Sequence, residues 1–190
     1  MYRHAPIEFC EVASQAMELL GSRYLNEFYS EDDAKRAWRE KLEETIFYLI
    51  WVANIDAFQH WIYEHPVQDR NQRRKAWLEI NERFYGKLYD WSELAEFRET
   101  MWQRQLHIFQ CPFYYIEYGI AQLGALGIWQ QSQKDSNKAV ENYCRALSLG
   151  GSKPLPELFA AAGLKFDFSE NTVGPLVDAV MREWEKVFDS

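Results

Sequence analysis

"AKRAWREKLEETIFYLIWVANIDAFQHWIY" occupies residues 34–63 and decides the fold. Its apolar side chains recur at helical spacing; they are Ala37, Trp38, Leu42, Ile46, Leu49, Ile50, Ala53, Ala57 and Trp61. Apolar residues three or four positions apart lie on one face of an α-helix. Pro66 cannot continue a helix, so the pattern predicts one long helix that ends before this proline.

The rest of the chain also favours helices. Pro6 suits a first helical turn, and the pattern after it predicts a helix over residues 6–29, followed by a new helix cap at Ser30. Further helices are expected over residues 70–85, 91–109, 112–133, 136–151, 154–164 and 172–188. No segment alternates with period two for long enough to predict a strand. We therefore expect an all-α fold and, without an obvious linker, a single helical domain over residues 1–190.

Composition limits the classes of function. Hydrophobic content of 47% and aromatic content of 16% exclude a disordered chain. A net charge of −8 offers no basic face for nucleic acid. No secretory signal is visible, and the longest apolar run, residues 46–53, is too short to span a bilayer. Three cysteines at unrelated spacings form no disulfide framework or metal knuckle, so we expect a cytoplasmic protein.

The four histidines do not make a zinc motif by themselves. None of His4, His60, His65 and His107 is followed by glutamate, so the H-E-x-x-H helix of zinc peptidases is absent. In "HWIYEH" the histidines at positions 60 and 65 are five residues apart, which places them about 140° apart around a helix. They cannot share a metal while that helix stays regular.

"HIFQCPFYYIEYG", residues 107–119, is chemically more informative. A histidine precedes a proline break and three tyrosines follow it, so His107, Tyr114, Tyr115 and Tyr118 can converge from two directions. Imidazole and phenol groups can donate hydrogen bonds to an oxyanion that develops in acyl transfer. The alternative is an ordinary aromatic stripe that packs in the core.

"PIEFCEVASQAMELL", residues 6–20, has its own ambiguity. Glu8, Glu11, Gln15 and Glu18 fall within one narrow arc of the expected helix. Carboxylates on one helix face are usually a solvated surface. They can also form one wall of a metal site, and the pattern alone does not choose.

Taken together, these two segments resemble oligoendopeptidase F, within the thimet oligopeptidase family of zinc metallopeptidases. The stretches "DAFQHWIYEHP", "RRKAWLEINERFYG" and "GGSKPLPELFAAAGLKFDFS" resemble the same family, so the resemblance covers essentially the whole chain. It implies the helical part of an oligopeptidase catalytic domain. The implied reaction is zinc-dependent hydrolysis of internal bonds in short peptides.

The resemblance also implies roles for individual residues. In that family zinc is held by the two histidines of H-E-x-x-H and by a glutamate on a following helix. Glu11 is the implied third metal ligand, and Glu18 is the implied carboxylate that orients a ligand histidine. His107, Tyr115 and Tyr118 correspond to residues that bind substrate and stabilise the tetrahedral intermediate, and Tyr114 corresponds to a substrate-binding residue.

The chain resembles only the C-terminal third of those peptidases. The H-E-x-x-H helix is expected to lie just before Met1, and Glu11 alone cannot hold zinc in a catalytic site that needs about three protein ligands. We therefore expect the isolated chain to be inactive, and its partners to be short peptides and an upstream peptidase segment supplied in trans, with self-association as another outcome. The alternative is a non-catalytic helical remnant or a protein-interaction module. Neither nucleic acid nor a membrane is an expected partner.

Overall fold

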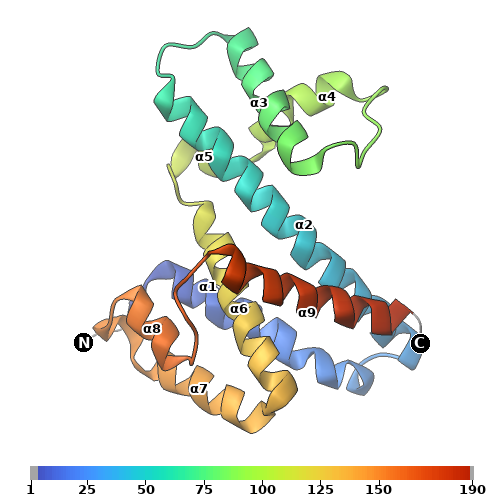
Figure 1. Cartoon of the computed structure of the whole chain (residues 1–190), viewed down its shortest axis with the longest axis vertical. Helices are drawn as coiled ribbons and strands as arrows, with labels where there is room; N and C mark the ends of the chain where they lie inside the picture. The colour runs from blue at the N-terminus through green and yellow to red at the C-terminus, as the bar shows by residue number, and fades with distance from the viewer. Residues whose placement is uncertain (1–3, 189–190) are drawn as a thin grey trace. The chain divides into compact units, whose positions relative to one another are not determined.

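The computed structural model describes residues 4–188, which form helices and connecting turns without strands (Figure 1). The expected all-α fold is therefore confirmed. The α-helices are α1 (Ile7–Gly21), α2 (Glu31–Glu64), α3 (Arg70–Tyr85), α4 (Ala95–Thr100), α5 (His107–Gln110), α6 (Ile116–Lys134), α7 (Ser136–Ser148), α8 (Leu155–Ala161) and α9 (Glu170–Phe188). The 3₁₀ helices are η1 (Ser22–Glu27), η2 (Met101–Arg104) and η3 (Gly150–Ser152). Within the described part, none of the helices combines the length and hydropathy that crossing a bilayer requires.

The chain packs as two compact units. The first contains the described residues up to Ile46 together with those from Ile120 onward, and the second runs from Phe47 to Gly119. Helices α2 and α6 each contribute residues to both units. The single domain expected from the sequence stays a prediction.

Local capping explains where α2 begins and where α3 begins and ends. The Ser30 hydroxyl accepts a hydrogen bond from the Asp33 backbone N–H at 3.3 Å, as the expected cap requires. Asp69 and Gln72 form a reciprocal capping box before α3, with both hydrogen bonds at 2.8 Å. Gly86 ends α3 with a φ of +52°, a backbone conformation that favours glycine. The helices expected over residues 34–63 and 70–85 are confirmed.

The first unit is held together by close approaches around α6. The rings of Phe9 on α1 and Phe159 on α8 meet edge to face, with centroids 6.0 Å apart. A Cβ atom on Gly124 of α6 would lie 2.9 Å from Val12 Cγ2 and 3.0 Å from Phe159 Cζ. Glycine at this position therefore lets α6 pack directly against α1 and α8.

The second unit has an aromatic core. Its buried members are Trp51, Val52, Ile55, Phe58, Ala76, Trp77, Trp102, Ile108 and Tyr115. Trp77 on α3 is fully buried, and its ring makes edge-to-face contacts with Trp51 at 6.0 Å and with Phe58 at 5.2 Å. These contacts attach α3 to α2 through large side chains.

Several helix boundaries predicted from the sequence are wrong. The helix expected over residues 6–29 changes to a 3₁₀ helix after Gly21, where the Ser22 hydroxyl donates to the Leu19 carbonyl oxygen at 2.8 Å. The helix expected over residues 112–133 begins only at Ile116, because Phe113 has a φ of +59°.

The single helix expected over residues 91–109 is also wrong, because it breaks into α4, η2 and α5. The buried Trp77 indole N–H donates to the Arg98 carbonyl oxygen at 2.7 Å. A continuous α-helix would use this carbonyl to accept a hydrogen bond four residues later. The indole therefore competes for the acceptor at the point where α4 changes to a 3₁₀ turn.

Candidate active site

The second unit gathers His107 and three tyrosines into one cluster of rings. His107 is the first residue of α5, and the tyrosines lie before and within the first turn of α6. The His107 ring centroid is 5.6 Å from that of Tyr114, 5.1 Å from that of Tyr115 and 5.7 Å from that of Tyr118. The sequence hypothesis placed these four side chains together, and the structure brings them together. Their catalytic roles stay predictions.

A strained turn at Phe113 directly precedes the three tyrosines. A phenylalanine with a φ of +59° is uncommon and costs conformational energy. Its ring lies 4.9 Å, centroid to centroid, from both His60 and Tyr63 on α2. These contacts offset the cost of the turn and hold it against α2. His60 is thereby used in packing, while His65 stacks on Trp61 at 4.6 Å.

Burial raises the pKa of two phenols of this region further above neutral pH. Burial raises the pKa of Tyr115, and the neighbouring Tyr118 reinforces this effect, whereas Trp51 and Arg104 oppose it. Burial, reinforced by Tyr89, raises the pKa of Tyr85 to about 12. Tyr115, like an ordinary phenol, carries its hydroxyl proton at neutral pH and can act as a donor.

Sequence reasoning missed a polar side chain that contacts His107. Gln105 Nε2 lies 2.7 Å from His107 Nδ1, and Gln105 Oε1 accepts a hydrogen bond from Trp51 Nε1 at 3.2 Å. The Arg104 guanidinium carbon lies 4.7 Å from the centroid of the Trp51 ring. The available signal was the position of Gln105 two residues before His107, but a single glutamine has no periodicity that marks it.

The first unit contains the two carboxylates of the implied metal wall. Glu11 lies half-buried on α1, and among the described residues its carboxylate has neither a hydrogen-bond nor an ion-pair partner. The Glu18 carboxylate is paired with Lys41 Nζ at 2.5 Å, and Lys41 also lies 3.5 Å from Glu44. Glu18 thus takes part in a surface ion pair, whereas the Glu11 carboxylate is unpaired within residues 4–188.

The described residues do not complete a catalytic zinc site. Within residues 4–188, no group of three or more His, Cys, Asp or Glu side chains could hold a metal ion. Catalytic zinc sites use about three protein ligands and one open position. The Glu11 carboxylate, which is unpaired among the described residues, suits one of those ligands.

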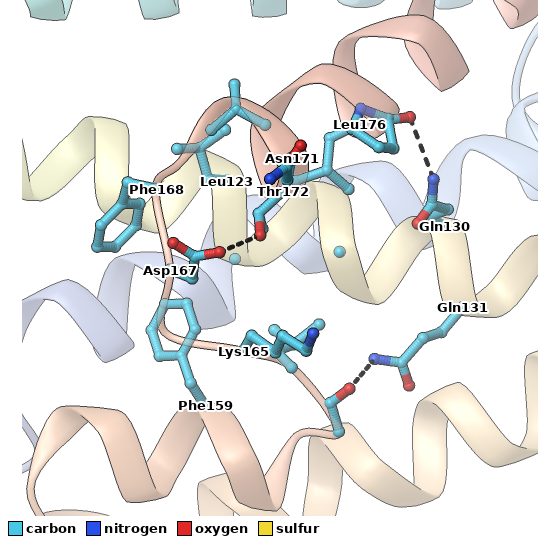
Figure 2. A pocket seen from close by; sticks show the side chains of 16 residues that line it. Leu123, Gln130, Gln131, Phe159, Lys165, Asp167, Phe168, Asn171, Thr172 and Leu176 are labelled. Carbon is cyan, nitrogen blue, oxygen red and sulfur yellow. Dashed lines mark hydrogen bonds between the residues drawn. The ribbon is translucent and has the colours of Figure 1, made fainter.

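A separate cavity of about 280 Å³ lies in the first unit, between α6, the α8–α9 connection and α9 (Figure 2). The polar groups of its wall bind one another: the Asp167 carboxylate accepts a hydrogen bond from Thr172, and Gln131 Nε2 donates to the Gly163 carbonyl oxygen at 3.2 Å. These bonds hold the α8–α9 connection in place. None of the predicted site residues lines this cavity.

Comparison with protein families gives a match to peptidase family M3 over residues 1–174. The chain belongs to peptidase family M3. The family expected from the sequence is therefore confirmed. Comparison with curated proteins gives no match.

Solved structures give the same family. The chain is 31% identical to a protein named as an oligoendopeptidase F, with a TM-score of 0.83 over 96% of this chain and 32% of that one. It is 30% identical to PZ peptidase A, solved with an inhibitor, with a TM-score of 0.83 over 95% and 33% of the two chains. It is 26% identical to a protein named as an oligoendopeptidase F from Bacillus anthracis str. Ames, with a TM-score of 0.79 over 99% and 30%. The M3 chain thus spans about a third of the length of each of these structures.

Proposed function

We propose that this chain carries part of the active site of a zinc-dependent peptidase that hydrolyses internal bonds in short peptides. The observation that carries the proposal is the cluster in which the His107 ring lies within 5.1–5.7 Å of three tyrosine rings. Membership of peptidase family M3 supports peptide bonds as the target. The expected cytoplasmic location stays a prediction.

The proposed role of the cluster is to bind the carbonyl oxygen of the cleaved bond. Hydrolysis adds water to the carbonyl carbon, and the carbonyl oxygen gains negative charge as the carbon becomes tetrahedral. The C–N bond then breaks and the amine leaves with a proton. Preorganised N–H and O–H donors stabilise this charge more strongly than they stabilise the substrate. We assign those donors to His107, Tyr115 and Tyr118, with Tyr114 on the substrate surface.

Glu11 is proposed as one carboxylate ligand of the metal, and Glu18 as a residue that orients a ligand histidine. Bound zinc would polarise the carbonyl group and activate water. The remaining ligands and a general base are proposed to come from a peptidase segment that carries H-E-x-x-H. The isolated chain should therefore not cleave a peptide, with or without added zinc.

The test is to complete the enzyme. The region that precedes the matching third of the related oligoendopeptidase F is joined to this chain or added in trans, and cleavage of a quenched fluorescent oligopeptide is measured. Tyr118→Phe removes one hydroxyl and keeps the ring, so kcat should fall by about 10²–10³-fold with a smaller change in KM. Tyr63→Phe is the matched control, because Tyr63 is an exposed tyrosine of the same unit.

Zinc binding tests Glu11 separately. Glu11→Gln keeps the shape of the side chain and removes its charge, so the zinc content of the completed enzyme should fall together with its activity. Glu8→Gln changes a neighbouring, half-buried carboxylate of the same helix and should leave zinc content unchanged. If the completed protein cleaves no peptide although it binds zinc, the alternative of a non-catalytic helical module is favoured. If Glu11→Gln retains full zinc content, the ligand role of Glu11 is wrong.

A further inference from the structure

The Gln105 side chain bridges two rings of the second unit. Its amide oxygen accepts from Trp51 Nε1 at 3.2 Å, and its amide nitrogen lies 2.7 Å from His107 Nδ1. Trp51 lies on α2 and is 9% exposed, Gln105 follows η2, and His107 opens α5. Three separate elements therefore determine the geometry of this bridge.

The indole N–H of Trp51 determines the orientation of the Gln105 side-chain amide. An indole N–H can only donate a hydrogen bond, so the group that faces Trp51 Nε1 has to be the amide oxygen of Gln105. The amide NH₂ group then faces His107 Nδ1. An amide nitrogen can only donate, so Nδ1 has to accept and carries no proton. In the neutral imidazole the proton is therefore on Nε2.

We propose that the Trp51–Gln105 pair is a positioning device that holds His107 in the Nε2–H tautomer. The ring then presents one N–H donor on the side away from Gln105. The catalytic use of this tautomer rests on the proposed function. A carbonyl oxygen that gains negative charge needs a hydrogen-bond donor, and a neutral imidazole has only one N–H to donate. The tautomer itself does not depend on that function. Gln105 and Trp51 are positioning residues, since they act through His107.

A second histidine in the same unit provides an internal reference. His65 Nδ1 lies 2.9 Å from the Trp61 carbonyl oxygen, which can only accept a hydrogen bond. The neutral His65 ring therefore carries its proton on Nδ1. The structure thus assigns opposite tautomers to His65 and His107.

The test is nitrogen-15 NMR of the histidine side chains in the chain of residues 1–190, at an alkaline pH where an ordinary histidine, with a pKa of about 6.5, is neutral. Long-range proton–nitrogen correlations show which ring nitrogen is protonated, and His107→Gln identifies the His107 signals. We expect the proton on Nε2 for His107 and on Nδ1 for His65. Gln105→Glu replaces the donor by an acceptor, so the proton of His107 should move to Nδ1.

Gln103→Glu is the matched control, because it makes the same change at an exposed position two residues away. It should leave the tautomer of His107 unchanged. Trp51→Phe removes the indole N–H and lets the amide turn over, so both His107 tautomers should be populated. A wild-type His107 that carries its proton on Nδ1 overturns the proposal, even if a variant does not fold. A Gln105→Glu spectrum that matches that of Gln103→Glu also overturns it.

The two proposals fail separately. An Nε2–H tautomer in a completed protein that cleaves no peptide leaves the positioning role correct and contradicts the peptidase function. An active completed enzyme with His107 protonated on Nδ1 leaves the function correct and contradicts the positioning role.

Discussion

Replacing Trp77 by phenylalanine tests whether the buried indole decides the shape of the chain that leads to the active-site cluster. The change removes the hydrogen bond to the Arg98 carbonyl oxygen, which measures 2.7 Å. The net contribution of such a bond is about 1 kcal/mol. The smaller ring also leaves a cavity next to Trp51 and Phe58, and loses buried apolar surface worth a further 1–2 kcal/mol, roughly, at a fully buried site. We expect the free energy of unfolding to fall by about 2–3 kcal/mol.

The assay is urea unfolding followed by circular dichroism, with hydrogen exchange to locate the effect. With an m-value of roughly 2–3 kcal/mol/M, the midpoint should fall by about 1 M. Amides of residues 95–110 should lose protection, because the hydrogen bond that ties this segment to α3 is gone. Trp184→Phe is the control, since its indole donates to the half-exposed Glu43 carboxylate at 2.8 Å in the other unit. Equal losses of stability in the two variants, or unchanged exchange over residues 95–110, would refute the reasoning.

Two further perturbations test the backbone and the electrostatics. Gly86→Ala forces alanine to a φ of +52° and should lower the free energy of unfolding by about 1–3 kcal/mol. Gly21 has a helical φ of −70°, and no atom lies within 4 Å of the methyl group that alanine would add. Gly21→Ala should therefore raise the free energy of unfolding by up to about 1 kcal/mol. Equal effects in urea unfolding would contradict the conformational argument. Because burial raises the pKa of Tyr85 from 10.0 to about 12, the unfolded chain loses this proton first, and stability should fall as the pH rises from 10 to 12. Tyr85→Phe should reduce that slope, and an unchanged slope would show that Tyr85 is not the group responsible.

Local sequence was sufficient for the class of fold and for the helices with strong punctuation. The helix over residues 70–85 lies between a capping box at Asp69 and a glycine at position 86, and both signals act within a few residues. For the long helix α2, the spacing of apolar residues predicted the helix and Pro66 predicted its end. The two segments that resemble oligoendopeptidase F also indicated the family without any structure, because long motifs carry more information than composition does.

Tertiary structure alone decided the features that depend on partners far apart in the chain. The helix expected over residues 91–109 breaks where the Arg98 carbonyl accepts from Trp77, 21 positions earlier. The proton of His107 is placed by Gln105, whose own orientation depends on Trp51, 54 positions before it. Helical periodicity reports only on neighbours three or four residues apart. The acceptor of a buried indole N–H depends on which groups the packed core places beside it, and no local sequence pattern encodes that contact.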